Sequence, residues 1–246
     1  MKSVKTIEIQ EWMRSEEARA LWRALNDDGE RQTLFVGGCV RNALLDAPVY
    51  DLDLATLHTP DEVISRLEAA GIRAIPTGVD HGTITAVINK HAFEITTLRK
   101  DVETDGRHAV IAFSTDWNED ANRRDFTMNT LLCDVEGNVY DPTGQGIDDL
   151  NARRLRFVGE ASARIAEDYL RILRYFRFHA LYAEGAPDAG ILAACKQAAP
   201  HIEGLSRERI TQEVFKILMV DKPADTLRIM RDNNILTALL RMKAGV

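Results

Sequence analysis

The chain has 246 residues, of which 45% are hydrophobic and 28% are charged, and its formal net charge is −7. That length can bury a substantial core in two compact units, and the composition is ordinary for a globular protein. The negative charge argues against a protein that coats nucleic acid without specificity. Because no apolar run approaches ~18 residues and the N-terminus lacks a signal-peptide core, we expect no membrane association and a cytoplasmic location.

The three cysteines, Cys39, Cys133 and Cys195, lie far apart and form no Cys-x-x-Cys pair. We expect reduced thiols, as in a cytosolic protein. Charge is distributed unevenly, since residues 151–180 contain seven arginines against three acidic residues. A cationic zone in an acidic chain favours a defined phosphate-bearing ligand.

The first part of the chain alternates helix and strand patterns. Residues 10–27 predict an amphipathic helix. Its core candidates are Trp12, Leu21, Trp22 and Leu25. Thr59, Pro60 and Glu62 form a capping signature for a helix that ends at Gly71. Further expected elements are a strand at 33–37, a helix at 39–45, strands at 49–55, 72–76, 83–89 and 92–98, and a hairpin turn at 136–138.

The rest of the chain is mainly helical in pattern. Residues 99–122 are polar and acidic and predict a long loop, which in a compact domain is usually functional or mobile. Helical patterning resumes at 124–132. Beyond residue 151, helices are expected at 161–183, 188–199, 206–220 and 223–241. The predicted fold class is α+β, with a mixed β-sheet and flanking helices in residues 1–150 and an all-α domain in residues 151–246.

Asp51 and Asp53 form the most informative pair in the sequence. On a strand, side chains at i and i+2 point to the same face, so the two carboxylates would lie side by side. Like charges at that spacing are unfavourable without a cation, and such a pair suits Mg²⁺ together with substrate phosphates. Upstream, Gly37 and Gly38 permit close backbone approach, and Arg41 would lie where a phosphate can bind. The combination predicts a metal-dependent nucleotidyl-transfer site.

Two further residues are candidates for the same chemistry. Glu94 is expected on a strand beside the Asp51–Asp53 strand, where a third carboxylate would complete a metal shell and orient an attacking hydroxyl. The alternative is a solvent-facing strand glutamate. Arg124 is expected at a helix start, where an arginine serves the helix dipole poorly, so it indicates contact with an anion or a ribose. The alternative is a structural N-cap with solvated arginines.

Asp168 and Arg171 lie three residues apart in a predicted helix and would be surface neighbours, so an intrahelical ion pair is the simple interpretation. The functional interpretation is base selection. A carboxylate accepts from the exocyclic amine of cytosine or adenine, while a guanidinium donates to the adjacent ring nitrogen. Guanine and uracil present the opposite order. Arg174 and Arg177 are rotated away from this face and are better placed for phosphates or helix packing.

In this order, the motifs resemble the head and neck domains of the bacterial CCA-adding enzymes (tRNA nucleotidyltransferases) and the related bacterial poly(A) polymerases. The resemblance runs from about Thr33 to Leu218. It is carried by Gly-Gly-x-Val-Arg at 37–41, Asp-x-Asp at 51–53, Phe-Glu-Ile-Thr-Thr-Leu-Arg at 93–99, Arg-Arg-Asp-Phe-Thr-Met-Asn at 123–129, Asp-Pro at 141–142, Arg-Phe-Val-Gly at 156–159, Glu-Asp-x-x-Arg-x-x-Arg at 167–174 and Leu-Ser-x-Glu-Arg-Ile at 205–210.

The resemblance implies addition of C and A, from CTP and ATP, to the 3′ acceptor end of tRNA, with release of pyrophosphate. It implies that Asp51 and Asp53 hold two Mg²⁺ ions. Residues 99–122 resemble the family's flexible loop, which helps the change from CTP to ATP addition. Nucleotide contacts are implied for Gly38, Arg41, Arg124, Asp168, Arg171, Arg174 and Arg177.

The sequence departs from the family pattern at two positions. Asn42 stands where the family usually has Asp, and Tyr169 stands where it usually has Pro. Family members usually continue with body and tail helices that grip tRNA, so we expect either a fragment or a compact variant. Val79 and Asp80 favour CCA addition over poly(A) addition, because poly(A) polymerases tend to carry basic residues there. Addition of CC or A alone, and a catalytically idle RNA-binding remnant, are the remaining alternatives.

Overall fold

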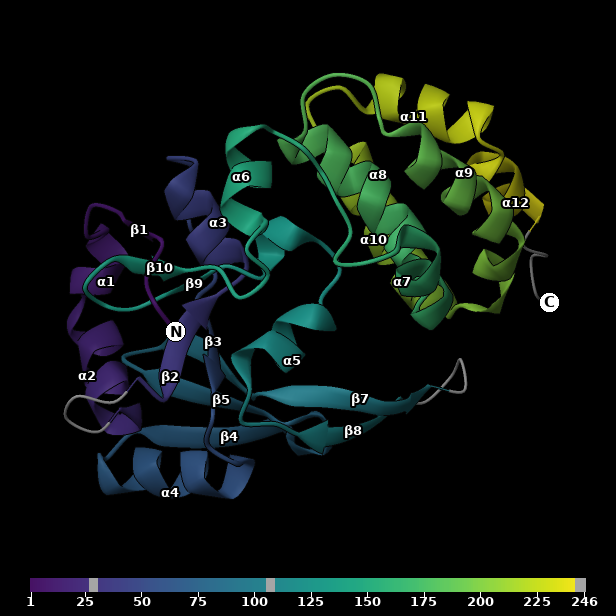
Figure 1. Cartoon of the computed structure of the whole chain (residues 1–246). Coiled ribbons are helices and arrows are strands. Elements are labelled where there is room, and N and C mark those ends of the chain that lie inside the picture. The colour runs from purple at the N-terminus through teal and green to yellow at the C-terminus, as the bar shows by residue number, and fades with distance from the viewer. Residues whose placement is uncertain (27–30, 105–108, 242–246) are drawn as a thin grey trace. The chain divides into compact units, whose positions relative to one another are not determined.

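The computed structural model describes residues 1–26, 31–104 and 109–241, and for 101–104 and 109–111 it describes the backbone. The chain divides into two compact units, Met1–Asp148 and Asp149–Val246. The first contains a mixed sheet with helices. In its described residues, the second contains helices without strands (Figure 1).

Eight strands form one sheet in the described residues of the first unit, in the order β1-β10-β9-β2-β3-β6-β5-β4. They are β1 (Lys5–Thr6), β2 (Thr33–Val36), β3 (Asp53–Thr56), β4 (Arg73–Gly78), β5 (Thr83–Ile88), β6 (His91–Thr97), β9 (Leu132–Cys133) and β10 (Asn138–Tyr140). β3 and β6 pair in parallel, whereas the other neighbours in the sheet are antiparallel. Strand β2 is central, and all four of its residues are buried.

The N-terminal helices pack on this sheet. They are α1 (Glu11–Arg14), α2 (Glu16–Leu25), α3 (Gly38–Leu44) and α4 (Pro60–Ala69). Helix α4 contacts α2, β4 and β5, and it lies along β4 in Figure 1. It has the predicted capping box between Thr59 and Glu62. The single helix predicted for 10–27 is wrong, because the Ser15 hydroxyl accepts from the amide N of Ala18 and starts a second helix there.

The prediction of a loop over 99–122 is also wrong in the described residues. Strands β7 (Arg99–Thr104) and β8 (Ala109–Phe113) form a separate antiparallel pair, and α5 (Trp117–Asn122) follows. The backbones of β7 and β8 hydrogen-bond to each other, so neither strand needs a neighbour from the main sheet. The charged residues of β7 concealed the strand in the sequence. Residues 105–108, the rest of the expected loop, lie outside the described residues.

The helix predicted at 124–132 is replaced by one 3₁₀ turn, η2 (Thr127–Asn129), followed by β9. The Asp125 carboxylate accepts from the amide N of Phe126 at 2.8 Å and from Asn129 Nδ2 at 3.0 Å. Local side-chain bonds of this kind compete with helix formation. The short 3₁₀ turn η1 (Val79–His81) connects β4 to β5.

The second unit follows α6 (Gly146–Asn151), which spans the division. It contains α7 (Ala161–Glu167), α8 (Leu170–Tyr182), α9 (Ala189–Ala198), the 3₁₀ segment η3 (Ala199–Gly204), α10 (Arg207–Leu218), α11 (Pro223–Asp232) and α12 (Ile235–Arg241). Two predicted helices are each divided. Extended backbone at Asp168 (φ −154°) separates α7 from α8, and Asn234 (φ 65°) separates α11 from α12. Across the described residues, no helix is long and apolar enough to cross a bilayer.

Candidate functional site

Three acidic residues gather at the start of β3. The parallel register pairs Asp53, the first residue of β3, with Glu94 on β6. Asp51 is exposed and precedes the strand, so the prediction that both aspartates lie on it is wrong. The reason is that pairing begins only at Asp53 with β6 and at Leu54 with β2. Burial, followed by the charges of Glu94 and Asp51, raises the pKa of Asp53 to about 6, while the charge of Arg124 acts in the opposite direction.

This acidic group fits a cation whose other ligands come from a substrate. Within residues 1–26, 31–104 and 109–241, no three His, Cys, Asp or Glu side chains could hold a metal ion by themselves. Mg²⁺ commonly binds proteins through one or two carboxylates together with waters and substrate phosphates. Crowded carboxylates, one of them with a raised pKa, form a donor set of that kind. Metal binding by Asp51 and Asp53 stays a prediction.

The Gly-Gly turn joins β2 to α3 and brings the arginine motifs together. Gly37 has φ +73°, and a Cβ there would lie 3.9 Å from Arg124 Nη1. Arg41 is only 6% exposed, and its Nη1 donates to Asn129 Oδ1 at 2.5 Å. Its Nε and Nη2 donate to Asn42 Oδ1 at 3.2 and 3.0 Å. Two amides therefore fix Arg41 beside Gly38, and contact of either residue with a nucleotide stays a prediction.

A buried aspartate anchors the second arginine motif. Asp120 is 3% exposed, and it accepts from Arg123 Nε at 2.9 Å and from Arg124 Nη2 at 2.8 Å. Burial favours a higher pKa for Asp120, but the two arginines outweigh it and lower the pKa. The predicted alternative of an N-cap with solvated arginines is therefore wrong. Arg124 is held with Nη1 near the Gly37 turn, and its predicted nucleotide contact stays a prediction.

Asp168 and Arg171 do not lie on one helix, because Asp168 is in the break between α7 and α8. Its Oδ1 accepts from the amide N of Leu170 at 3.1 Å, and its Oδ2 accepts from Arg209 Nη2 at 2.7 Å. Arg171 Nη1 donates to Glu167 Oε2 at 2.6 Å. The carboxylate and the guanidinium predicted to select the base are thus each oriented by another charged side chain.

Arg177 and Arg174 contribute to helix packing. Arg177 Nε donates to Glu213 Oε2 at 2.7 Å across the α8–α10 contact, and Glu213 is only 4% exposed. Arg174 Nη1 lies 4.0 Å from the same carboxylate. Both guanidinium groups also lie over the Phe178 ring, at 5.2 Å for Arg174 and 4.5 Å for Arg177. This agrees with the helix-packing interpretation, and nucleotide contact by either arginine stays a prediction.

The sequence interpretation missed three supporting residues, Asp120, Asn129 and Arg209. A signal was present for Asp120, because its spacing to Arg123 and Arg124 is i+3 and i+4. Asn129 and Arg209 contact partners that are distant in sequence, so no local spacing identifies them.

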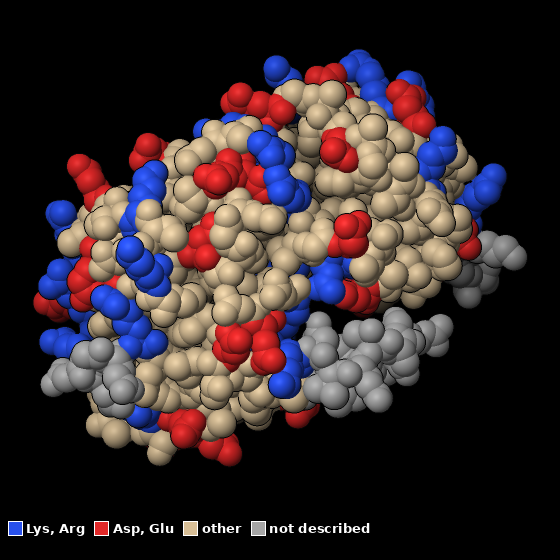
Figure 2. Space-filling model, in the orientation of Figure 1, with Lys and Arg blue, Asp and Glu red and all other residues tan. Residues whose placement is uncertain are grey.

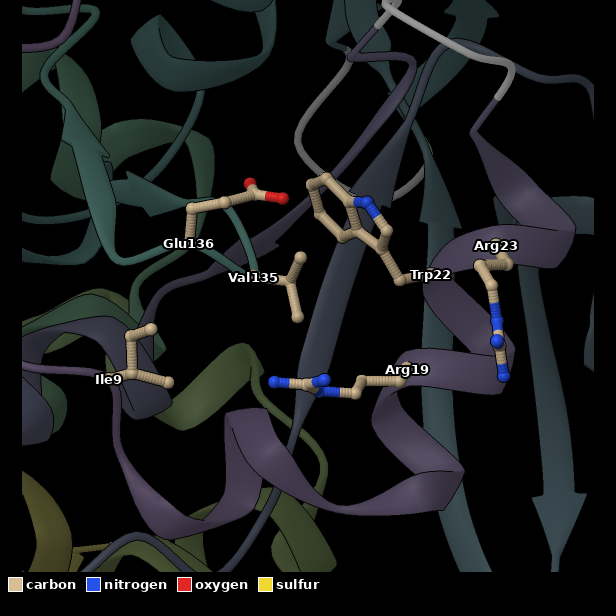
Figure 3. Close-up of a pocket in the computed structure, with 6 residues that line it drawn as sticks. All are labelled: Ile9, Arg19, Trp22, Arg23, Val135 and Glu136. Atoms are coloured by element: carbon tan, nitrogen blue, oxygen red, sulfur yellow. The ribbon is translucent and has the colours of Figure 1, made fainter.

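A cavity of about 280 Å³ in the first unit lies apart from these residues. Its lining residues are Ile9, Arg19, Trp22, Arg23, Val135 and Glu136 (Figure 3). Arg19 extends across the cavity beneath Val135, and the Glu136 carboxylate points towards Trp22 (Figure 3). The predicted site residues are not among those that line it. The candidate site is therefore defined by strand register and not by this cavity.

Comparison with known families agrees with this arrangement of motifs. Residues 33–156 match the family model described as "Poly A polymerase head domain", and residues 187–243 match "Probable RNA and SrmB- binding site of polymerase A". The chain belongs to the poly(A) polymerase head-domain family, which confirms the resemblance inferred from the motifs.

Curated relatives carry names of CCA-adding enzymes. The chain is 46% identical over 197 residues to the mitochondrial CCA tRNA nucleotidyltransferase 1 of Danio rerio, covering 79% of this chain and 46% of that protein. It is 40% identical over 190 residues to the CCA-adding enzyme of Streptococcus sanguinis, covering 76% of this chain and 46% of that protein. The chain thus spans about half the length of the curated relatives it matches.

Solved structures confirm the α+β fold class. The CCA-adding enzyme of Bacillus stearothermophilus in complex with CTP superposes with a TM-score of 0.81 at 32% identity, covering 93% of this chain and 54% of that one. A tRNA nucleotidyltransferase complexed with a primer tRNA and an incoming ATP analog gives a TM-score of 0.70 at 25% identity, covering 85% of this chain and 59% of that one.

Proposed function

We propose that this chain is the catalytic part of a CCA-adding tRNA nucleotidyltransferase. In the proposed reaction, the 3′-hydroxyl oxygen of tRNA attacks the α-phosphate of CTP or ATP. A new phosphodiester bond forms, the bond to the β-phosphate breaks, and pyrophosphate leaves. The observation that carries the proposal is the placement of Asp53 beside Glu94, with Asp51 two residues ahead, in a member of this family.

In the first unit we assign the phosphoryl chemistry to Asp51 and Asp53, which would hold Mg²⁺. The ion, when bound, would lower the pKa of the attacking hydroxyl and stabilise charge on the entering and leaving oxygens. Glu94 would orient the hydroxyl from the neighbouring strand. Arg124 lies close enough to lower the pKa of Asp53, so its charge is available to an anion at the same place. Gly38 and Arg41 would contact the nucleotide from the start of α3.

In the second unit we assign the choice of base to Asp168 and Arg171. Asp168 would accept from the amine of cytosine or adenine, and Arg171 would donate to the adjacent ring nitrogen. Arg209 and Glu167 support this assignment because they orient the two side chains at 2.7 and 2.6 Å. Arg174 and Arg177 keep helices α8 and α10 together through Glu213.

The charge balance of the two units favours tRNA contact through the second. The first unit contains 15 Lys and Arg against 26 Asp and Glu, whereas the second contains 16 against 12. On the face drawn in Figure 2, acidic and basic side chains are interspersed and form no broad field of one sign. Contacts to RNA phosphates would therefore be a limited number of defined ones and not a general coating.

The experiment that tests the function is extension of a tRNA that lacks its 3′ CCA, with Mg²⁺ and each nucleoside triphosphate supplied separately and together. We expect incorporation of C, then A, and no incorporation of G or U. Long runs of A would identify a poly(A) polymerase, the description attached to the matched family model. Addition of only C or only A would identify a partial enzyme, and no incorporation would indicate an RNA-binding remnant.

We propose a cytoplasmic location for this protein. The names of some relatives place those proteins in mitochondria.

A further inference from the structure

Tyr50 stands immediately before the candidate metal site and is 86% exposed. A single exposed apolar side chain is ordinary on a protein surface. The position of Tyr50 is not ordinary, because consecutive Cα atoms are only 3.8 Å apart and the next residue is Asp51. If the 3′-hydroxyl of an RNA reaches Asp51 and Asp53, its terminal nucleotide lies beside the segment that carries Tyr50, and the base of that nucleotide is a candidate partner for the exposed ring.

The segment that carries Tyr50 is held by Asn42 of helix α3. Asn42 Nδ2 donates to the carbonyl O of Pro48 at 2.8 Å, and the amide N of Ala47 donates to the carbonyl O of Asn42 at 2.9 Å. The Oδ1 atom of the same side chain accepts from Arg41 Nε and Nη2. One amide thus connects Arg41 to the chain that leads into Tyr50 and Asp51.

Only an amide of this size can make both contacts. An aspartate at position 42 could accept from Arg41. It could not donate to Pro48, and its second oxygen would face the Pro48 carbonyl oxygen. Asn42 therefore adds a fixed point to the segment that presents Tyr50.

We propose that Tyr50 is a stacking surface for the base of the RNA 3′-terminal nucleotide, and that Asn42 is the residue that positions it. This inference rests on the proposed function. Base–aromatic stacking tolerates any base because every base has a π-face. That property suits a site at which the terminal base is not the same at every addition. A hydrogen-bonding contact specific for one base would not fit all of the steps.

The test uses binding without nucleoside triphosphate, so that it does not depend on catalysis. A short RNA stem with a free 3′-hydroxyl is compared with the same RNA carrying an abasic 3′-terminal nucleotide, and both dissociation constants are measured by fluorescence anisotropy. For wild type we expect the abasic RNA to bind about tenfold more weakly. Tyr50→Ala should bind the intact RNA about tenfold more weakly and should not distinguish the two RNAs. Tyr50→Phe and Tyr50→Trp should retain the preference, and Val4→Ala, an exposed apolar control in the same unit, should match wild type.

Asn42→Asp tests the positioning role. It should weaken binding of the intact RNA, and in the double variant with Tyr50→Ala it should add little, because both changes remove the same contact. An unchanged preference for the intact RNA in Tyr50→Ala, or equal losses on both RNAs, would overturn the proposal. If Tyr50→Ala loses affinity for the intact RNA but not for the abasic RNA, and the wild-type chain extends no RNA, the proposed function is contradicted and the proposal of a stacking surface stands. Failure of wild type to bind RNA would contradict both.

Discussion

Asp53 and Glu94 occupy matched positions on the parallel strands β3 and β6. Parallel neighbours in register present their side chains on the same face, so two carboxylates lie side by side, and Asp51 adds a third charge from the preceding segment. The pKa of Asp53 rises to about 6 as a result of burial and these charges. The arrangement is unfavourable for the protein alone and favourable in the presence of a cation.

The first prediction concerns pH and stability without metal. The pKa of Asp53 is higher in the folded protein than the ordinary value near 3.9, so its contribution to stability is present below about pH 4 and is lost as pH rises through about 6. Asp53→Asn removes this titration. In EDTA above pH 6.5, the variant should be more stable than wild type by on the order of 2 kcal/mol, and the difference should shrink towards pH 4. Urea unfolding across this pH range measures it, and parallel profiles for the two proteins would refute it.

The second prediction concerns base choice. Arg171→Ala removes a donor used by both correct bases, so kcat/KM should fall for CTP and for ATP. Asp168→Ala should also weaken the rejection of UTP and GTP, because an acceptor facing their carbonyl oxygen is what repels them. Relative kcat/KM values for the four nucleotides measure both effects. Arg228→Ala, which removes an exposed ion pair with Asp225, is the control and should leave nucleotide preference unchanged.

If Asp168→Ala and Arg171→Ala lower only the overall rate and leave the ratios among the nucleotides unchanged, the two residues are structural. Their bonds, which include those to Arg209 and Glu167, would then serve the structure of this unit alone.

The third prediction concerns Glu213 as the link between α8 and α10. Its carboxylate is 5% exposed and accepts from Arg177, with Arg174 and Lys216 nearby. Glu213→Ala leaves the largely buried Arg177 without this partner and should reduce the free energy of unfolding by about 3 kcal/mol. Thermal and urea unfolding measure the change. A loss no greater than that of Arg228→Ala would show that the link contributes little.

The fourth prediction uses two glycines with similar backbone angles. Gly137 and Gly71 have φ +83° and +70°, but a Cβ at Gly137 would lie 2.5 Å from the carbonyl O of Ile7, whereas none of the described atoms lies within 4 Å at Gly71. Alanine at either position is strained at positive φ, at a cost of about 1 kcal/mol. Gly137→Ala must also displace the backbone at Ile7, which directly follows β1, so it should be clearly the more destabilising. Equal melting temperatures for the two variants would contradict this.

Much of the first unit could be predicted from local sequence signals. The capping box at Thr59 and Glu62 and the buried strand at 33–36 are both encoded within a few residues. The division at Asp168 was missed, although the bond that accompanies it is local: the Asp168 carboxylate accepts from the amide N of Leu170 at the start of α8. The pairing of β7 with β8 was missed because β7 is charged, which concealed the strand, and because the two strands pair with one another outside the main sheet.

In the candidate site, too, local patterns could be predicted from the sequence, whereas contacts between distant segments could not. The Asp-x-Asp spacing indicated paired carboxylates, and the register of β3 with β6 brings Glu94 beside Asp53. The sequence could not reveal that Asp51 lies outside the strand, because that depends on where pairing with β6 and β2 begins. It also could not reveal that Arg41 is buried between two amides, since one of them, Asn129, comes from a distant segment.

The most direct measurement is single-turnover extension of a tRNA lacking its 3′ CCA, in Mg²⁺, by wild type, Asp51→Asn and Asp53→Asn. Both substitutions keep the shape of the side chain and remove its charge. If the two carboxylates hold the metal, each variant should lose incorporation of every nucleotide by about a thousandfold or more, as expected when several kcal/mol of transition-state stabilisation are removed. The variants should remain folded, with Asp53→Asn more stable than wild type in EDTA. Extension at the wild-type rate by either variant would contradict the assignment of nucleotidyl transfer to this pair.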